Sequence, residues 1–334
     1  MLSIFFVIIG LSVLILVHEW GHFLVARWFG LLIEEFGIGF PPRLFSKKSK
    51  GTIFSINAVP LGGFVKIYGE NSGLGGNIEH PEKSFAYQTA WKRALIVIAG
   101  VAMNFLLGWL IISVVFFVGS RSLVLVDLVQ DSSPAATAGF QTGDQILGFD
   151  NSEKLVSYIE QNRGKEISLK INRSGEELTF KAMPRIFTEA GQGALGLGLR
   201  DAGIPRHGLF ESIVQGFIAS VSIVVAVVLG LYQAIFSPQQ VLGPVGIFDA
   251  AVDTGRLGII YLAQFVALIS LNLVVLNLLP IPALDGGRLL FIIIEKIRGK
   301  RFLKETEIKA NTIGFGFLIA LIVLVTIKDI AGLF

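Results

Sequence analysis

The sequence has no cysteine and few charged residues: 334 residues include no Cys, and 16% are Asp, Glu, Lys or Arg. Without cysteine a disulfide framework, a thiolate metal site and a thiol nucleophile are all excluded. Soluble domains carry about 25% charged residues. The low charge, with 53% hydrophobic residues and a mean hydropathy of +0.70, therefore predicts a polytopic membrane protein. The net charge of +3, with no basic stripe interleaved with aromatics, argues against nucleic-acid binding.

The first residues also lack the marks of a cleavable signal peptide. No Lys or Arg precedes the apolar run that begins at Leu2, and no small-residue cleavage site follows it. We therefore expect this run to be a retained first membrane span. Three more apolar segments approach the ~20 residues that cross a bilayer: residues 94–118, 257–284 and 310–327.

The first span contains the motif H-E-x-x-H, from His18 to His22. On a helix, positions i and i+4 share one face, so both imidazoles can reach one metal ion. Glu19 need not be a ligand and can take a proton from water that the metal activates. Ionisable groups in lipid cost about 2.5–3.5 kcal/mol each, so this setting favours a functional site over two interfacial histidines at a helix end.

A candidate third ligand ends the third long apolar segment. Pro280 and Pro282 break the helix just before Asp285, the only acidic residue between Asp253 and Glu295. Asp-Gly is a common turn dipeptide, which gives Asp285 a plain structural interpretation. Alternatively Asp285 binds a metal, because two histidines, one carboxylate and water form an accepted catalytic zinc site.

Basic residues predict the topology. Residues 31–93 and the stretch after Asp285 are rich in Lys and Arg, which places both on the cytoplasmic side. The H-E-x-x-H motif and Asp285 then both lie at the inner ends of their spans, where they can meet. Residues 214–236 are uncharged and long enough to cross, but a single crossing would separate Asp285 from the histidines. We therefore expect that segment to lie in the interface or to re-enter.

Between the second and third spans the sequence turns polar, with short alternating strands. The phrase from Ser133 to Leu147 resembles the S-P-A-x-x-A-G-L-x-x-G-D-x-I segment of PDZ domains. Gly196-Leu197-Gly198 resembles, more weakly, the loop with which those domains hold a peptide's terminal carboxylate. Such domains bind extended peptides by strand addition. The alternative is a PDZ fold that serves as a spacer or steric cover.

In order and spacing together, these features resemble the bacterial site-2 proteases, intramembrane zinc metalloproteases of the regulator-of-sigma-E protease type. The resemblance covers nearly the whole chain. It rests on H18-E-x-x-H22, Gly100-x-x-x-Asn104, the single PDZ-like segment, Gly243-Pro244 and N277-L-L-P-I-P-A-L-D285-G-G. Better-known Gram-negative members carry two tandem PDZ domains, whereas this chain has room for one.

The resemblance implies that His18, His22 and Asp285 bind one Zn²⁺ per chain and that Glu19 is the general base. Substrate-binding residues are then Asn104, Asn277, Pro280, Pro282, Gly62, Gly63, Phe64 and Val65. Asn277 is also placed to stabilise an oxyanion. From the residues alone the strand after Pro60 is a plain hairpin; the resemblance makes it an edge that pairs with an unwound substrate.

The implied substrate is a single-span membrane protein, such as an anti-sigma factor or signal-peptide remnant, already cut by an upstream site-1-type protease. The implied location is the bacterial cytoplasmic membrane, with the PDZ-like domain and both termini extracytoplasmic. One alternative function is that of a metal-binding transporter, which would need polar groups along several spans. An inactive scaffold that binds peptides through the PDZ-like domain would need no zinc.

We predict a polytopic α-helical membrane protein with four transmembrane helices, an inserted extracytoplasmic PDZ-like domain and a membrane-associated β-hairpin. The predicted order is span 1–30, cytoplasmic or re-entrant β loop 31–93, span 94–119, PDZ-like domain 120–203, peripheral or re-entrant segment 204–256, span 257–287, cytoplasmic loop 288–309 and span 310–334.

Overall fold

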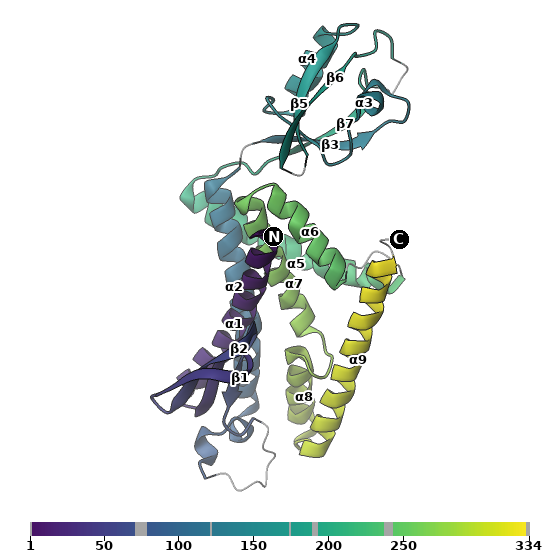
Figure 1. Ribbon diagram of the computed structural model, residues 1–334. Coiled ribbons are helices and arrows are strands. Elements are labelled where there is room, and N and C mark those ends of the chain that lie inside the picture. Colours follow the sequence, from purple (N-terminus) through teal and green to yellow (C-terminus); the bar gives the residue numbers. More distant parts are fainter. Residues whose placement is uncertain are drawn as a thin grey trace. The chain divides into compact units, whose positions relative to one another are not determined.

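The computed structural model describes residues 2–70, 79–120, 122–173, 175–188, 193–236 and 243–331. The chain forms two compact units (Figure 1). Met1–Ser113 and Ile213–Phe334 form the first, here called the helical unit. Val114–Ser212 form the second, called the inserted unit.

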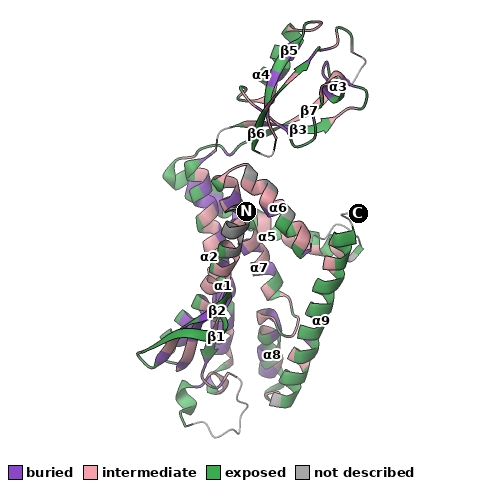
Figure 2. Cartoon of the chain, viewed as in Figure 1, coloured by how far each residue is buried: buried purple, intermediate pink, exposed green. Residues whose placement is uncertain are grey.

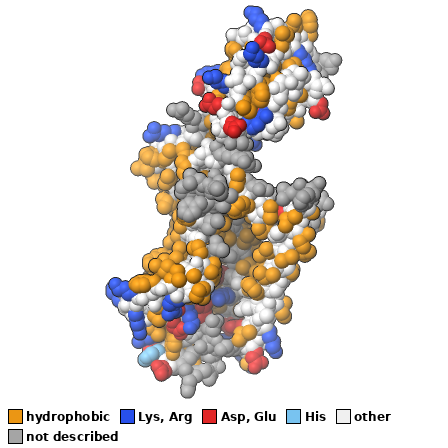
Figure 3. Space-filling view, viewed as in Figure 1, with side chains coloured by type: hydrophobic (Ala, Val, Ile, Leu, Met, Phe, Trp, Pro, Cys, Tyr) orange, Lys and Arg blue, Asp and Glu red, His pale blue; other side chains and the backbone are white. Residues whose placement is uncertain are grey.

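Within the described residues, five helices are long and apolar enough to cross a membrane. They are α1 (Leu2–Trp28), α2 (Ala90–Val118), α5 (Leu209–Phe236), α7 (Ile259–Leu278) and α9 (Lys304–Ala331). Figure 2 shows α9 exposed along most of its length, and Figure 3 shows hydrophobic side chains along α9 and over other parts of the visible face of this unit. Apolar side chains exposed over whole helices suit a lipid solvent rather than water.

Helix α5 is the fifth of these helices and covers the segment that we expected to be peripheral or re-entrant. It is one continuous helix of 28 residues, and its length and composition also allow it to cross. It packs on α2, where the Phe217 ring meets the rings of Phe105 and Trp109 at 5.9 and 5.3 Å. The four-span count stays a prediction.

The chain after Asp285 is helical where we expected a cytoplasmic loop at residues 288–309. Helix α8 (Asp285–Arg298) fills most of that range, and α9 already begins at Lys304 rather than at residue 310. The reason is amphipathicity: α8 buries Ile292 and Glu295 on one face, and Glu295 forms a buried ion pair with Arg93 at 2.6 Å. The remaining helix, α6 (Pro244–Arg256), starts directly after Gly243.

Two bent strands, β1 (Ile33–Ser49) and β2 (Thr52–Ile67), follow α1. Residues 35–38 of β1 pair with residues 53–56 of β2 and again with residues 63–66, so the latter form an edge of the sheet. Gly62 adopts φ +86°, a left-handed conformation that glycine takes without strain, where the chain turns after Pro60. At Gly63 a Cβ would lie 2.6 Å from the Leu16 side chain, so glycine lets this edge approach α1. Two short 3₁₀ turns, η1 (Pro81–Lys83) and η2 (Phe85–Tyr87), lead on to α2.

The described residues of the inserted unit form a five-stranded antiparallel sheet in the order β6-β5-β4-β3-β7. Its elements are β3 (Leu123–Val129), α3 (Pro134–Ala138), β4 (Gln145–Ile146), α4 (Ser152–Gln161), β5 (Ile167–Arg173), β6 (Glu176–Ala182) and β7 (Leu197–Ala202). The helix, turn and strand predicted from Ser133 onward are present. Ser133 Oγ accepts from Ala136 N–H to cap α3, and Gly139 ends that helix at φ +92°.

Candidate metal centre and active site

Helix α1 presents both motif histidines on one face. His18 and His22 are separated by one turn, and their Nε2 atoms lie 3.1 Å apart. Each residue is only 8% exposed. Helix α2 approaches the two imidazoles closely at Gly100. Glycine leaves room for them there, because a Cβ at this position would lie 2.4 Å from His22 Nε2. A larger residue at position 100 would therefore push the imidazoles out of place.

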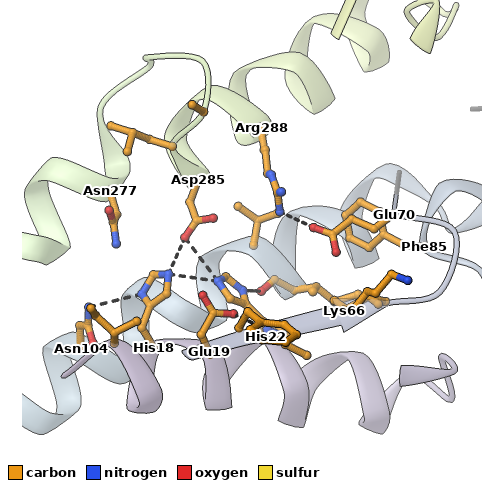
Figure 4. Close-up of a pocket in the computed structure, with 18 of the residues that line it drawn as sticks. His18, Glu19, His22, Lys66, Glu70, Phe85, Asn104, Asn277, Asp285 and Arg288 are labelled. Atoms are coloured by element: carbon orange, nitrogen blue, oxygen red, sulfur yellow. Dashed lines mark hydrogen bonds and ion pairs between the residues drawn. The ribbon is translucent and has the colours of Figure 1, made fainter. Parts of the chain in front are cut away.

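Asp285 reaches the same point from the start of α8 (Figure 4). Its Oδ2 atom lies 2.9 Å from His18 Nε2 and 3.4 Å from His22 Nε2. The chain breaks between α7 and α8 around the two prolines, so Asp285 turns back toward α1. Gly286 fits this tight turn, because a Cβ there would lie 2.2 Å from the Leu279 carbonyl oxygen.

The three atoms suit a tetrahedral metal ion. His18, His22 and Asp285 offer ligand atoms that all lie within 4.8 Å of one another. Zinc–ligand distances of about 2.0–2.1 Å in a tetrahedron separate the ligand atoms by roughly 3.3 Å, and the observed separations run from 2.9 to 3.4 Å. Asp285 Oδ2 is buried without a hydrogen-bond partner in the described part of the chain, and a bound cation would satisfy it.

Outer contacts orient both imidazoles. His22 Nδ1 lies 2.8 Å from the Ile96 carbonyl oxygen, so Nδ1 carries the proton and Nε2 keeps its lone pair for a metal. His18 Nδ1 lies 3.3 Å from Asn104 Nδ2, while Asn104 Oδ1 is buried without a partner among the described residues. Rotating this amide by 180° would let Oδ1 accept from His18 Nδ1–H and would satisfy both groups.

Glu19 lies between the histidines in sequence and points toward the same space in Figure 4. Its Oε2 atom accepts a hydrogen bond from the Val65 backbone N–H at 3.0 Å. The carboxylate is therefore held by the edge of the β1–β2 sheet and not by the other metal-site residues. This leaves it next to the ligands but outside the ligand set.

The site opens into a cavity of about 540 Å³. Four of the residues predicted to bind substrate line it: Phe64, Val65, Asn104 and Asn277. Four others are not among the lining residues: Gly62, Gly63, Pro280 and Pro282. Gly62 lies where the chain turns into the edge strand, Gly63 lets that strand approach α1, and the two prolines lie in the break before Asp285. Gly196, Leu197 and Gly198 belong to the inserted unit, where Gly196 adopts φ +74° before β7.

Sequence reasoning missed several residues of this cavity. Among them are Ile15, Glu70, Phe85, Leu273 and Arg288. Arg288 forms an ion pair with Glu70, which joins α8 to the turn after β2. Arg288 follows Asp285 by one helical turn, a spacing that could have marked it as a neighbour of the site. Its charge entered the prediction only as a topology signal.

Comparison with known proteins identifies the class. The profile of Peptidase family M50 matches residues 6–321, so the chain belongs to this family. The family and the protease class predicted from the motifs are thereby confirmed.

Individual relatives match over nearly their whole length. The regulator of sigma-W protease RasP of Bacillus subtilis is 30% identical, with 98% of each chain covered. The zinc metalloprotease RasP of Shouchella clausii is 30% identical, with 97% of each chain covered. A protein of Clostridium perfringens is 34% identical, with 98% of each chain covered.

Proposed function

We propose that this chain is an intramembrane zinc metalloprotease that cleaves the transmembrane segment of single-span membrane proteins. The observation that carries the proposal is that Asp285 of α8 meets His18 and His22, with Glu19 beside them, at helix α1, which is long and apolar enough to span a membrane. Relatives named as zinc metalloproteases support zinc as the metal. The donor set of two imidazoles and one carboxylate suits it as well.

The chain's own groups then divide the work of peptide hydrolysis. When bound, zinc supplies the Lewis acidity that activates water and polarises the scissile carbonyl. Glu19 takes the proton of the attacking water and later gives it to the leaving amine. Asn277 lines the same cavity, and its amide N–H₂ is the donor that we assign to the developing oxyanion.

A transmembrane substrate must unwind before it can be cut, because its helical carbonyls are held in i→i−4 hydrogen bonds. Where water is scarce, the unwound backbone needs new partners. The edge formed by residues 63–66 offers them, and its residues Phe64 and Val65 line the cavity. We assign this edge to strand pairing with the substrate.

We assign the inserted unit to a single PDZ-like domain. Its sheet, its two helices and the capped turn from Ser133 support that assignment, and Gly196-Leu197-Gly198 would hold a peptide carboxylate. We place this domain and both termini outside the bacterial cytoplasmic membrane, with the metal site toward the inner side. The substrate would be an anti-sigma factor or a signal-peptide remnant already cut by a site-1-type protease. A relative named as a regulator of sigma-W protease supports a regulatory substrate.

The test is cleavage of a model single-span substrate in detergent, with metal analysis, for wild type, Glu19→Gln and Asp285→Asn. We expect wild type to cut and to hold one zinc. Glu19→Gln should keep the zinc and lose cleavage by about 10²–10⁴-fold, the usual contribution of a general acid–base. Asp285→Asn should lose zinc. Equal cleavage by Glu19→Gln would remove Glu19 as the base, and a wild type without metal or cleavage would favour the peptide-binding scaffold.

A further inference from the structure

The backbone of residues 63–66 has one side already paired. Val65 lies opposite Phe36 of β1, and Gly63 lies opposite Ile38. Along an antiparallel strand, the backbone groups of successive residues point alternately toward the partner and away from it. Val65 N–H donates to Glu19 on α1, so Val65 belongs to the set that points away from β1. Gly63, two residues earlier, belongs to the same set.

These outward groups are the ones that an added strand would use. No strand in the described part of the chain pairs with this side of residues 63–66. The Ile67 carbonyl is already engaged, because it accepts from Glu70 N–H in the following turn. The edge therefore presents the backbone of Val65, which lines the cavity, to an extended chain, and the backbone of Gly63, outside the lining, continues the same edge.

The Val65 N–H, however, already has an acceptor. Glu19 Oε2 lies 3.0 Å from Val65 N, and both groups lie in the same cavity. A single N–H makes one good hydrogen bond at a time. The carboxylate of Glu19 and a carbonyl of an added strand must therefore compete for it.

We propose that the Glu19–Val65 contact is a latch that an extended substrate opens. It rests on the proposed strand pairing: a substrate carbonyl takes the Val65 N–H, and the released Glu19 carboxylate turns toward the water that it must deprotonate. A carbonyl in a helix is occupied by its own i→i−4 bond and cannot take the N–H. Only an unwound segment frees the base, so Val65 couples the shape of the substrate to catalysis as a positioning residue.

Binding to two inactive holoenzyme variants tests the competition. The Glu19→Gln variant keeps a side-chain acceptor for Val65 N–H, whereas the Glu19→Ala variant has none. We expect the model single-span substrate to bind Glu19→Ala about 2- to 10-fold more tightly than Glu19→Gln, the range of one net hydrogen bond. Leu24→Ala, combined with Glu19→Gln, removes an apolar side chain of α1 that does not line this cavity, and this variant should bind like Glu19→Gln alone. Equal zinc content in all three shows that the metal site is intact.

The Val65 amide itself gives a second readout. In ¹⁵N-valine-labelled holoenzyme its resonance is assigned through Val65→Ile. We expect the amide proton to move upfield from wild type to Glu19→Ala and to move back when substrate is added to that variant. Equal affinities with an unmoved resonance, in an enzyme whose wild type binds and cuts the substrate, would overturn the latch and leave the protease intact. Wild type that neither binds nor cuts would overturn both.

Discussion

In the inserted unit, strand β5 buries every second residue, Ile167, Leu169 and Ile171, and exposes the residues between them. The helical unit does the reverse: its long helices expose apolar side chains and bury polar ones such as Asn104 and Glu295. The first pattern is that of a protein surface in water and the second that of one in lipid. The comparison teaches where to look for function, because a polar group inside the helical unit must have a partner or a task.

The buried polar groups of the helical unit include two sets of particular interest. One set surrounds the metal site: His18, His22 and Asn104. The other ties α2 to α8, where Arg93 pairs with Glu295, whose second oxygen accepts from Phe302 N–H at 3.2 Å. The second set is not part of the metal site. Its role is structural: it holds α8, the helix that begins with Asp285, against α2.

The largest expected effect comes from breaking that tie. Arg93→Met leaves the buried Glu295 carboxylate without its partner, which typically costs 3–5 kcal/mol. The free energy of unfolding in detergent should fall by about that amount. The double variant Arg93→Met/Glu295→Leu removes both charges and should recover most of the loss. A double variant as unstable as the single one would show that packing rather than charge holds α2 to α8.

A core substitution in the inserted unit should show that this unit and the metal site of the helical unit are independent. Ile171 is fully buried in that unit's core, and Ile171→Ala should cost about 2–5 kcal/mol through a cavity. Because the metal ligands all belong to the helical unit, zinc content at low temperature should not change. Proteolysis of the inserted unit and metal analysis of the same sample measure the two effects. Zinc loss in parallel with unfolding would show that the metal site depends on the folded inserted unit.

The smallest expected effect concerns the outer contact of His18. Asn104→Ala removes the amide and should weaken zinc binding by about 10- to 100-fold. Asn104→Asp keeps an oxygen that can accept from His18 Nδ1–H and should retain most of the affinity. Competition with a zinc chelator measures both. If the Asp variant were as weak as the Ala variant, the amide would not act as the acceptor for His18.

The candidate metal ligands could be predicted from the sequence because their signals are local. H-E-x-x-H lies within one stretch of helix, and Asp285 is the lone acid in a long apolar region. By contrast, Glu70 and Arg288 are 218 positions apart, and no local pattern joins them. The double pairing of residues 35–38 was equally hidden, because nothing in a strand's periodicity says that both of its sides are used. Helix α8 was missed for another reason: its basic residues were taken as marks of a loop.

One contact far from the metal has a mechanical consequence. Asp329, near the end of α9, accepts from Gly243 N–H and Gly246 N–H at the start of α6. At the other end of α9, Asn311 Oδ1 accepts from Ala283 N–H in the turn before Asp285. Helix α9 is thus held by hydrogen bonds near both ends and is exposed between them. A force on the exposed face of α9 would therefore be transmitted along the helix to the turn that sets the position of Asp285.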